Sequence, residues 1–335
     1  MNYLLLFTAL VFSVTNLSAK RIFVTTNGTA AASGISWNDA TDLHSATQRA
    51  TANDEIWVQT GTYLTSTNGD RSASFRIMAG VSLYGGFVGT ESSLNERPAA
   101  SRSLLSGEIG NTASIDDNAW TILTLLADTD AVTYVDGFTI TAGNAFKDSR
   151  SLNAANAGGG IFMHKGNGFL TAHEISNCTF KNNKGMNGAA VFVATGNPLF
   201  ENCFFANNAA DFKGGAVYNQ GAGSQANARF VDCRFESNSA KHGGAIANNG
   251  ENGVSNPLLI NCQFISNVAR NNGSAVYNMS NDMGHCAVIT EQCFFGGNIC
   301  TLGEVIGSRG ETKSVQQRRS QSDNTDVIIS GSVKR

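Results

Sequence analysis

The residue types in this sequence with the strongest potential for chemistry are paired carboxylates, histidines and cysteines. Asp116 and Asp117 stand next to each other in a polar stretch. Hydrolysis of a glycosidic bond needs two carboxyl groups about 5–10 Å apart, and a polysaccharide lyase needs a basic residue beside bound Ca²⁺. We interpret the Asp116–Asp117 pair as part of a surface loop, and the sequence predicts no catalytic residue.

Metal binding is the second chemistry to consider. Zinc requires clustered Cys and His side chains at ligand spacing, and His285, Cys286 and Cys293 supply too few ligands. Three other histidines stand singly beside Gly-rich turns or loops, and we expect each to be solvated. They are His164, His173 and His242. The sequence therefore predicts no metal site and no cofactor.

Five of the seven cysteines recur in a short block that ends in Phe, with an Asn three residues further on. The cysteines are Cys178, Cys203, Cys233, Cys262 and Cys293, and the asparagines are Asn183, Asn208, Asn238, Asn267 and Asn298. Cys and Phe lie two apart, so on a strand they share one face. The residue between them varies, as solvent permits. We predict a buried, reduced Cys column, because stacking does not set up disulfide torsions. Cys286 and Cys300 fall outside this column and either pair with each other or stay free.

A second block alternates with the first and ends in Ile or Val after small residues, as in Gly158–Ile161, Gly214–Val217 and Gly243–Ile246. The combined period is about 29 residues, with short strands and no helical pattern between them. That period is too short for a propeller blade and lacks the helix of a leucine-rich repeat. It predicts a parallel β-helix whose equivalent residues stack about 4.8 Å apart, with the asparagines as a ladder at one corner.

The same pattern divides the chain. Residues 20–306 are predicted to form the β-helix, with the N-terminal cap and first coils in 20–110 and the regular coils in 135–306. The apolar spacing in Ser36–Ala50 predicts a short helix that caps the open end of the stack. We expect Gln220–Asn227 and Asn248–Asn256 to form side loops, and residues 307–335 to form a polar, partly disordered tail.

Composition adds limits on location and partners. Residues 1–19 hold an apolar run that ends in Ser18–Ala19, which predicts a secretory signal peptide with an uncleaved anchor as the alternative. No later stretch approaches a membrane span, so we expect no integral membrane domain in the mature chain. The net charge of −3 gives no basic footprint for nucleic acid. We expect a secreted or cell-surface protein.

The alternation of Phe-x-x-Asn with Gly-Gly-Ala-Ile/Val resembles the repeat of the chlamydial polymorphic membrane proteins. More broadly it resembles right-handed β-helix proteins of the pectin-lyase-like superfamily on bacterial surfaces. The segments Asp54–Val58, Gly61–Tyr63 and Tyr84–Phe87 are similar to the opening of secreted members. The resemblance covers about Arg21 to Ile306 and implies an all-β, right-handed solenoid.

Two classes of function follow from this resemblance. Adhesin-like members imply a binding or structural scaffold with glycans or surface proteins as partners, and exposed aromatic side chains would serve such binding. Phe204, Tyr218, Phe294 and Tyr277 are the candidates for such exposed rings, and for any single one of them we favour packing under a loop. Members that cleave acidic polysaccharides imply a lyase or glycoside hydrolase instead. Asp116–Asp117 lacks the further Asp, His-Gly and Arg-x-Lys elements of the polygalacturonases, so we favour the scaffold.

Overall fold

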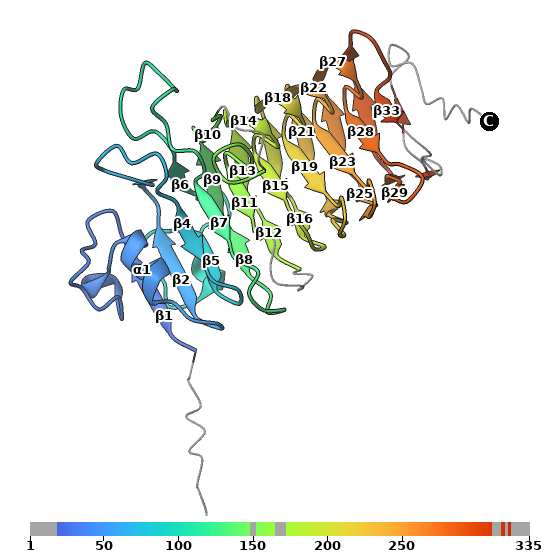
Figure 1. Cartoon of the computed structure of the whole chain (residues 1–335). Helices are drawn as coiled ribbons and strands as arrows, with labels where there is room; N and C mark the ends of the chain where they lie inside the picture. Colours follow the sequence, from blue (N-terminus) through green and yellow to red (C-terminus); the bar gives the residue numbers. More distant parts are fainter. Residues whose placement is uncertain (1–18, 148–151, 165–171, 310–315, 319–320, 323–335) are drawn as a thin grey trace, which may run out of the picture.

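The computed structural model describes residues 19–147, 152–164, 172–309, 316–318 and 321–322. Short strands stack along one axis from the N-terminal end to the C-terminal end, and the molecule is elongated (Figure 1). Every strand pairing within the described ranges is parallel, and each strand inside a sheet pairs with its equivalents in the previous and next coils. The predicted all-β parallel β-helix is therefore confirmed.

Three parallel sheets (A, B and C) run along the stack, and a fourth, sheet D, joins them from β10 (Asn144–Ala145) onward. Sheet A contains β1 (Arg21–Val24), β2 (Glu55–Gln59), β5 (Ser82–Phe87), β8 (Tyr134–Asp136), β12 (Glu174–Ser176), β16 (Leu199–Glu201), β20 (Arg229–Val231), β25 (Leu258–Ile260), β30 (Ile289–Glu291) and β34 (Gln316–Arg318). Sheet B contains β3 (Thr62–Leu64), β6 (Ser103–Ser106), β9 (Phe138–Thr141), β13 (Thr179–Lys181), β17 (Phe204–Ala206), β21 (Arg234–Glu236), β26 (Gln263–Ile265), β31 (Phe294–Gly296) and β35 (Gln321–Ser322). Sheet C contains β4 (Phe75–Ile77), β7 (Leu123–Leu125), β11 (Ile161–Met163), β15 (Val191–Val193), β19 (Val217–Gln220), β23 (Ile246–Asn249), β28 (Val276–Met279) and β33 (Ile306–Arg309). Sheet D contains β10 (Asn144–Ala145), β14 (Lys184–Asn187), β18 (Ala209–Lys213), β22 (Ser239–His242), β27 (Val268–Asn272) and β32 (Ile299–Cys300).

One regular coil runs through the sheets in the order A, B, D, C, for example from β12 to β15. Its three corners are formed by residues with positive φ, namely Asn177 (φ 51), Asn182 (φ 55) and Gly188 (φ 54). Asn tolerates this left-handed conformation better than most residues. At the third corner only Gly fits, because a Cβ on Gly188 would lie 2.3 Å from the carbonyl oxygen of Val191.

The interior is built from stacked identical side chains. The rings of Phe180, Phe205 and Phe235 stack with centroids 4.8 and 4.7 Å apart and nearly parallel planes. All five cysteines of the predicted column are buried and free, and the Phe residues two positions later are buried beside them. The predicted reduced Cys column is confirmed, and Cys286 and Cys300 are also free thiols.

Two ladders of asparagine side chains run along the axis. The corner ladder consists of the predicted Asn183, Asn208, Asn238, Asn267 and Asn298, where each amide donates to the next (2.9–3.1 Å). The inner ladder, which the sequence analysis missed, consists of Asn219, Asn248 and Asn278 on sheet C. It continues the inward column that Met163 and Val193 occupy in earlier coils.

The N-terminal end is capped, but not by one helix. The segment predicted as Ser36–Ala50 forms the 3₁₀ helix η1 (Trp37–Asp39) and the helix α1 (Leu43–Arg49). The break lies at Thr41, whose backbone bridges to Val24 of β1 and whose N–H donates to the carbonyl of Phe23 (2.9 Å). Helix α1 begins at the cap residue Asp42 and buries Leu43 and Ala46 over the end of the core.

Side loops leave the stack after sheet C and partly stack on each other. The strands β24 (Val254–Ser255) and β29 (His285–Cys286) form a small parallel sheet within the predicted loop Asn248–Asn256 and its successor. A further 3₁₀ helix, η2 (Leu94–Glu96), lies in the loop after β5. At the other end, β34 and β35 extend sheets A and B into residues 307–335.

Candidate functional site

The carboxylates considered for catalysis lie in the loop between β6 and β7. Asp116 is exposed, whereas Asp117 is half-buried and accepts a hydrogen bond from the backbone N–H of Asn111 (2.5 Å). Across the described residues no group of three or more His, Cys, Asp or Glu side chains is arranged to hold a metal ion. The pair lies in a loop, as the sequence predicts.

The structure separates the residues considered for zinc. The Cys293 thiol lies in the interior and donates to the Leu259 carbonyl (3.4 Å). The Cys286 thiol donates to the side-chain oxygen of Asn278 (3.6 Å), and burial raises its pKa to about 12. The Nδ1 of His285 instead contacts the side-chain oxygen of Asn256 (2.8 Å).

The expectation of solvated histidines is wrong for one of the three. His164 is exposed and His242 is half-buried, but His173 is only 1% exposed. Burial lowers the pKa of His173 to about 4, and neither ring nitrogen has a hydrogen-bond partner in the described part of the chain. A buried imidazole is held neutral in this way because the apolar surroundings disfavour the cation.

Two of the four candidate aromatic residues are buried, which is the outcome that the sequence analysis favours for any single one of them. Tyr218 is 2% and Tyr277 is 3% exposed, while Phe294 is 38% exposed and Phe204 is half-buried. Both tyrosines do point outward from sheet C, in a column that begins with Phe162 and Phe192. They are buried because side chains of the neighbouring sheet D cover them: the Lys213 ammonium lies 5.5 Å from the Tyr218 ring centroid, and the His242 ring stacks on Tyr277.

The cover over the tyrosines forms the most chemically distinctive surface we find. We call it the Phe212 cluster, and it comprises Phe212 and Lys213 of β18, Lys241 and His242 of β22, and Tyr277 of β28. The His242 ring stacks on Tyr277 with centroids 5.0 Å apart, and Phe212 meets His242 edge to face at 5.8 Å. Phe212 itself is 40% exposed. Three coils thus contribute rings to one corner between sheets D and C.

Cations surround these rings. The Lys213 ammonium lies 5.0 Å from the Phe212 ring centroid, and the Lys241 ammonium lies 5.7 Å from it. Burial lowers the pKa of Lys213, and the pKa of His242 is lowered by burial and then by the neighbouring cations Lys241, Lys213 and Arg309. Ion pairs within the described ranges involve neither lysine. The cluster is therefore a positively charged aromatic surface, suited to an anionic ligand with a flat face.

A sequence signal for this cluster exists but is weak. The residue before each corner glycine is Asn187, Lys213, His242 and Asn272 in successive coils, and these positions pair in register. The column holds Asn, Lys, His and Asn in turn, so no repeated residue type marks it.

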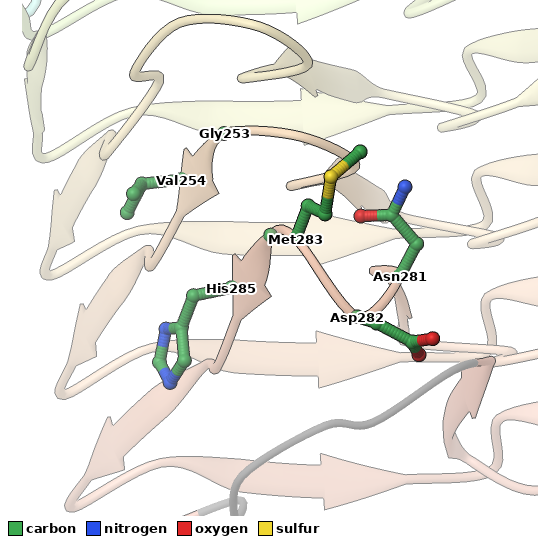
Figure 2. A pocket seen from close by; sticks show the side chains of 7 residues that line it. Gly253, Val254, Asn281, Asp282, Met283 and His285 are labelled. Atoms are coloured by element: carbon green, nitrogen blue, oxygen red, sulfur yellow. The ribbon is translucent and has the colours of Figure 1, made fainter.

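A concave feature lies elsewhere, on the side loops (Figure 2). Its cavity of about 390 Å³ is lined by Gly253, Val254 and the turn 281–285. The side chain of Asn281 is held by Asn252 of the previous coil (2.8 Å), and Met283 is 78% exposed. The His285 ring points away from Met283 and Asp282, so the cavity brings together no acid–base pair.

The described residues contain no helix that is long and apolar enough to cross a membrane. A comparison with curated proteins finds no match to this chain. A family model described as a right-handed β-helix region matches residues 125–293, half of the 335-residue chain. The matched range contains the stacked parallel coils that hold the cysteine column, the inner asparagine ladder and the corner ladder as far as Asn267. The chain therefore belongs to the right-handed β-helix family, with the pectin-lyase-like architecture that its repeats predict.

Proposed function

We propose that this protein is an exported, adhesin-like binding scaffold, secreted or displayed on a bacterial surface, and that it binds acidic glycans without cleaving them. The observation that supports binding is the Phe212 cluster, where aromatic rings and unpaired lysines share one corner. Sugar rings pack on aromatic faces, and lysine ammonium groups attract carboxylate or sulfate substituents. The apolar run within residues 1–19, which precedes the first described residue, supports export.

The rigidity of the scaffold supports the same proposal. The rings of the cluster come from β18, β22 and β28. Lys213, His242 and Tyr277 hold paired positions in the ladders of sheets D and C, and Phe212 lies in the irregular stretch just before Lys213. A site on stacked strands loses little conformational entropy when a ligand binds, because its groups are ordered beforehand. The similarity to polymorphic membrane protein repeats supports a surface role but names no ligand.

The test measures binding of the full chain to immobilised uronate-containing and neutral polysaccharides. We expect binding to the acidic polymer that weakens with salt, and a Phe212→Ala/Lys241→Ala variant should lose about tenfold in affinity, or roughly 1.4 kcal/mol. The matched control is Phe204→Ala/Arg234→Ala on sheet B, where an arginine also lies over a Phe ring (5.8 Å). Equal losses in both variants would contradict the assigned site.

The same polysaccharides distinguish the scaffold from an enzyme. We expect no new unsaturated or reducing ends after incubation with the protein, with or without added Ca²⁺. Release of such ends would contradict the scaffold and favour a lyase or glycoside hydrolase. Adhesion to cells that survives enzymatic removal of their glycans would indicate a protein ligand instead.

A further inference from the structure

The first coil of the stack begins with a backbone hydrogen bond to a buried carboxylate. The Lys20 N–H donates to Oδ1 of Asp54 (3.0 Å), and the Lys20 carbonyl accepts from the N–H of Glu55 (2.9 Å). Strand β1 starts at the next residue, Arg21, and pairs with β2 at the N-terminal end of the molecule (Figure 1). The residue before Lys20, Ala19, is exposed. Among the described residues, ordered pairing therefore starts at the Lys20 nitrogen.

Asp54 is a buried carboxylate that stays charged. Its side chain is 2% exposed, and it also accepts from the N–H (2.8 Å) and the hydroxyl (3.0 Å) of Thr51. Burial raises the pKa of Asp54, but the N–H donors of Lys20 and Thr51 outweigh burial and hold the pKa below its ordinary value. The carboxylate is therefore ionised at neutral pH, and a buried negative charge needs a positive partner.

The Lys20 side chain supplies only part of this partner. Its ammonium lies 3.3 Å from Oδ2 of Asp54, but the side chain is 50% exposed and the same ammonium donates to the Arg49 carbonyl (3.1 Å). The Arg49 guanidinium donates instead to the carbonyl of Ala32 (2.7 Å). Within the described ranges, Asp54 forms an ion pair with Lys20 alone. The Oδ1 atom of this carboxylate thus meets a neutral backbone N–H.

Cleavage of the peptide bond between Ala19 and Lys20 would turn that N–H into a cation. The signal peptide predicted for residues 1–19 ends in the small residues Ser18 and Ala19, as a signal peptidase requires. Hydrolysis consumes one water, leaves a carboxylate on Ala19, and leaves on Lys20 an ammonium that carries both hydrogens of the water. We propose that cleavage after Ala19 creates the mature N-terminus and that Asp54 binds its ammonium group in a buried ion pair. This inference rests on the export proposed above and adds a processing site and its receptor.

Processing strengthens a contact that already exists. The donor atom lies 3.0 Å from the Asp54 carboxylate before cleavage, so no rearrangement of the first coil is needed. Hydrogen bonds between ionised partners are about twice as strong as neutral ones. An opposite charge at this distance also favours the protonated form of the new amine. The mature N-terminus is therefore fixed to β2 and reacts slowly as a nucleophile.

The rate of acylation of the N-terminal amine at pH 8 tests the pairing. The full-length chain is exported from a bacterial host, and mass spectrometry of the purified protein should identify Lys20 as the first residue. We expect the parent amine to react at least about tenfold more slowly than that of Asp54→Asn, which removes the charge and keeps the shape. The matched control is Glu55→Gln, which removes the neighbouring acid that pairs with Arg21 (3.6 Å) and should react as the parent does.

An insertion separates capture of the amine from the charge of Asp54. Two residues, Gly-Ser, placed between Ala19 and Lys20 move the amine away while the carboxylate stays, and this variant should react as fast as Asp54→Asn. Circular dichroism establishes that each variant retains the fold.

A chain that starts at Lys20 but reacts equally fast in the parent and in Asp54→Asn, or equal acceleration in Glu55→Gln, would overturn the capture and leave export intact. A chain that retains residues 1–19 would overturn the processing site and favour an uncleaved anchor. Neither readout depends on glycan binding by the Phe212 cluster.

Discussion

The two asparagine ladders of this solenoid consist of the same side chain and differ in what holds each amide. In the corner ladder, the Nδ2 of Asn238 donates to the Phe205 carbonyl of the previous coil (2.9 Å) as well as to Asn267 (3.0 Å). Its backbone N–H donates to the same Asn267 oxygen (3.1 Å). Each corner amide thus joins the backbone of neighbouring coils.

The inner ladder has amide-to-amide contacts within the stack and little else. Asn248 accepts from Asn219 (2.7 Å) and donates to Asn278 (2.8 Å). At the ends, the Asn219 Oδ1 and the Asn278 Nδ2 have no hydrogen-bond partner in the described part of the chain. We infer that a repeated Asn is structurally essential where its side chain hydrogen-bonds to backbone groups. It is replaceable where its side chain bonds mainly to equivalent Asn side chains in neighbouring coils.

The largest expected effect is that of Asn238→Ala. It removes the acceptor for the Asn208 amide and the donor for the Phe205 carbonyl, and leaves these buried groups unsatisfied. We expect the free energy of unfolding to fall by at least about 3 kcal/mol, measured by denaturant unfolding with hydrogen exchange to locate the loss. The exposed Gln263→Ala is the control. A loss below that of an inner-ladder variant would refute the comparison.

Asn248→Ala should have a smaller effect on the same measurement. It leaves the Asn219 Nδ2 and the Asn278 Oδ1 without their amide partner, but no backbone group of the coil loses a bond to the Asn248 side chain. We expect a loss of about 1–3 kcal/mol, confined in hydrogen exchange to sheet C. Loss of protection in sheet B would show that the inner ladder also supports the corners.

Replacing the whole inner ladder should cost less than removing its centre. Met163 and Val193 already occupy this inward column in earlier coils, so Asn219→Val/Asn248→Val/Asn278→Val extends an apolar column. Removing every partner together leaves no orphaned amide, and we expect unfolding free energies within about 1 kcal/mol of the parent. A triple variant less stable than Asn248→Ala would mean that the amides contribute net stability to the stack.

The same contrast explains what the sequence could predict. The Cys and Phe columns and the corner ladder recur in five coils because packing and backbone bonding demand those residues, and all were predicted. The inner ladder occurs in three coils only, where Asn replaces Val193 and Met163, so it left a weaker pattern.

Outward-facing residues were harder to predict. Tyr218 and Tyr277 point outward as expected, but Lys213 of the same coil (5.5 Å) covers Tyr218 and His242 of the previous coil (5.0 Å) covers Tyr277. The Phe212 cluster takes one or two residues from each coil, so no single repeat contains its pattern. The burial of His173 likewise depends on its neighbours in space and not on its own Gly-rich surroundings.

The smallest expected effect is on how often the inner ladder opens transiently in the folded protein. The rate at which a buried thiol is chemically labelled measures this opening. Burial raises the pKa of Cys286 to about 12, so its thiol stays protonated and unreactive between pH 7 and 9, where only transient opening exposes it. Its sulfur donates to the Asn248 carbonyl (3.7 Å) and to Asn278. We expect Asn248→Ala to accelerate labelling of Cys286 several-fold and to leave Cys262, in the interior column, unchanged.

Mass spectrometry of the labelled peptides measures both rates in one sample, and the partly exposed Cys300 serves as the reference that reacts first. Equal acceleration at Cys286 and Cys262 would mean that the inner amides and the interior column open as one unit. Acceleration at Cys286 alone would establish that the face of sheet C opens independently. We expect acceleration at Cys286 alone, because the Asn248 side chain bonds to the side chains of Asn219 and Asn278 and, among the described residues, to no backbone group.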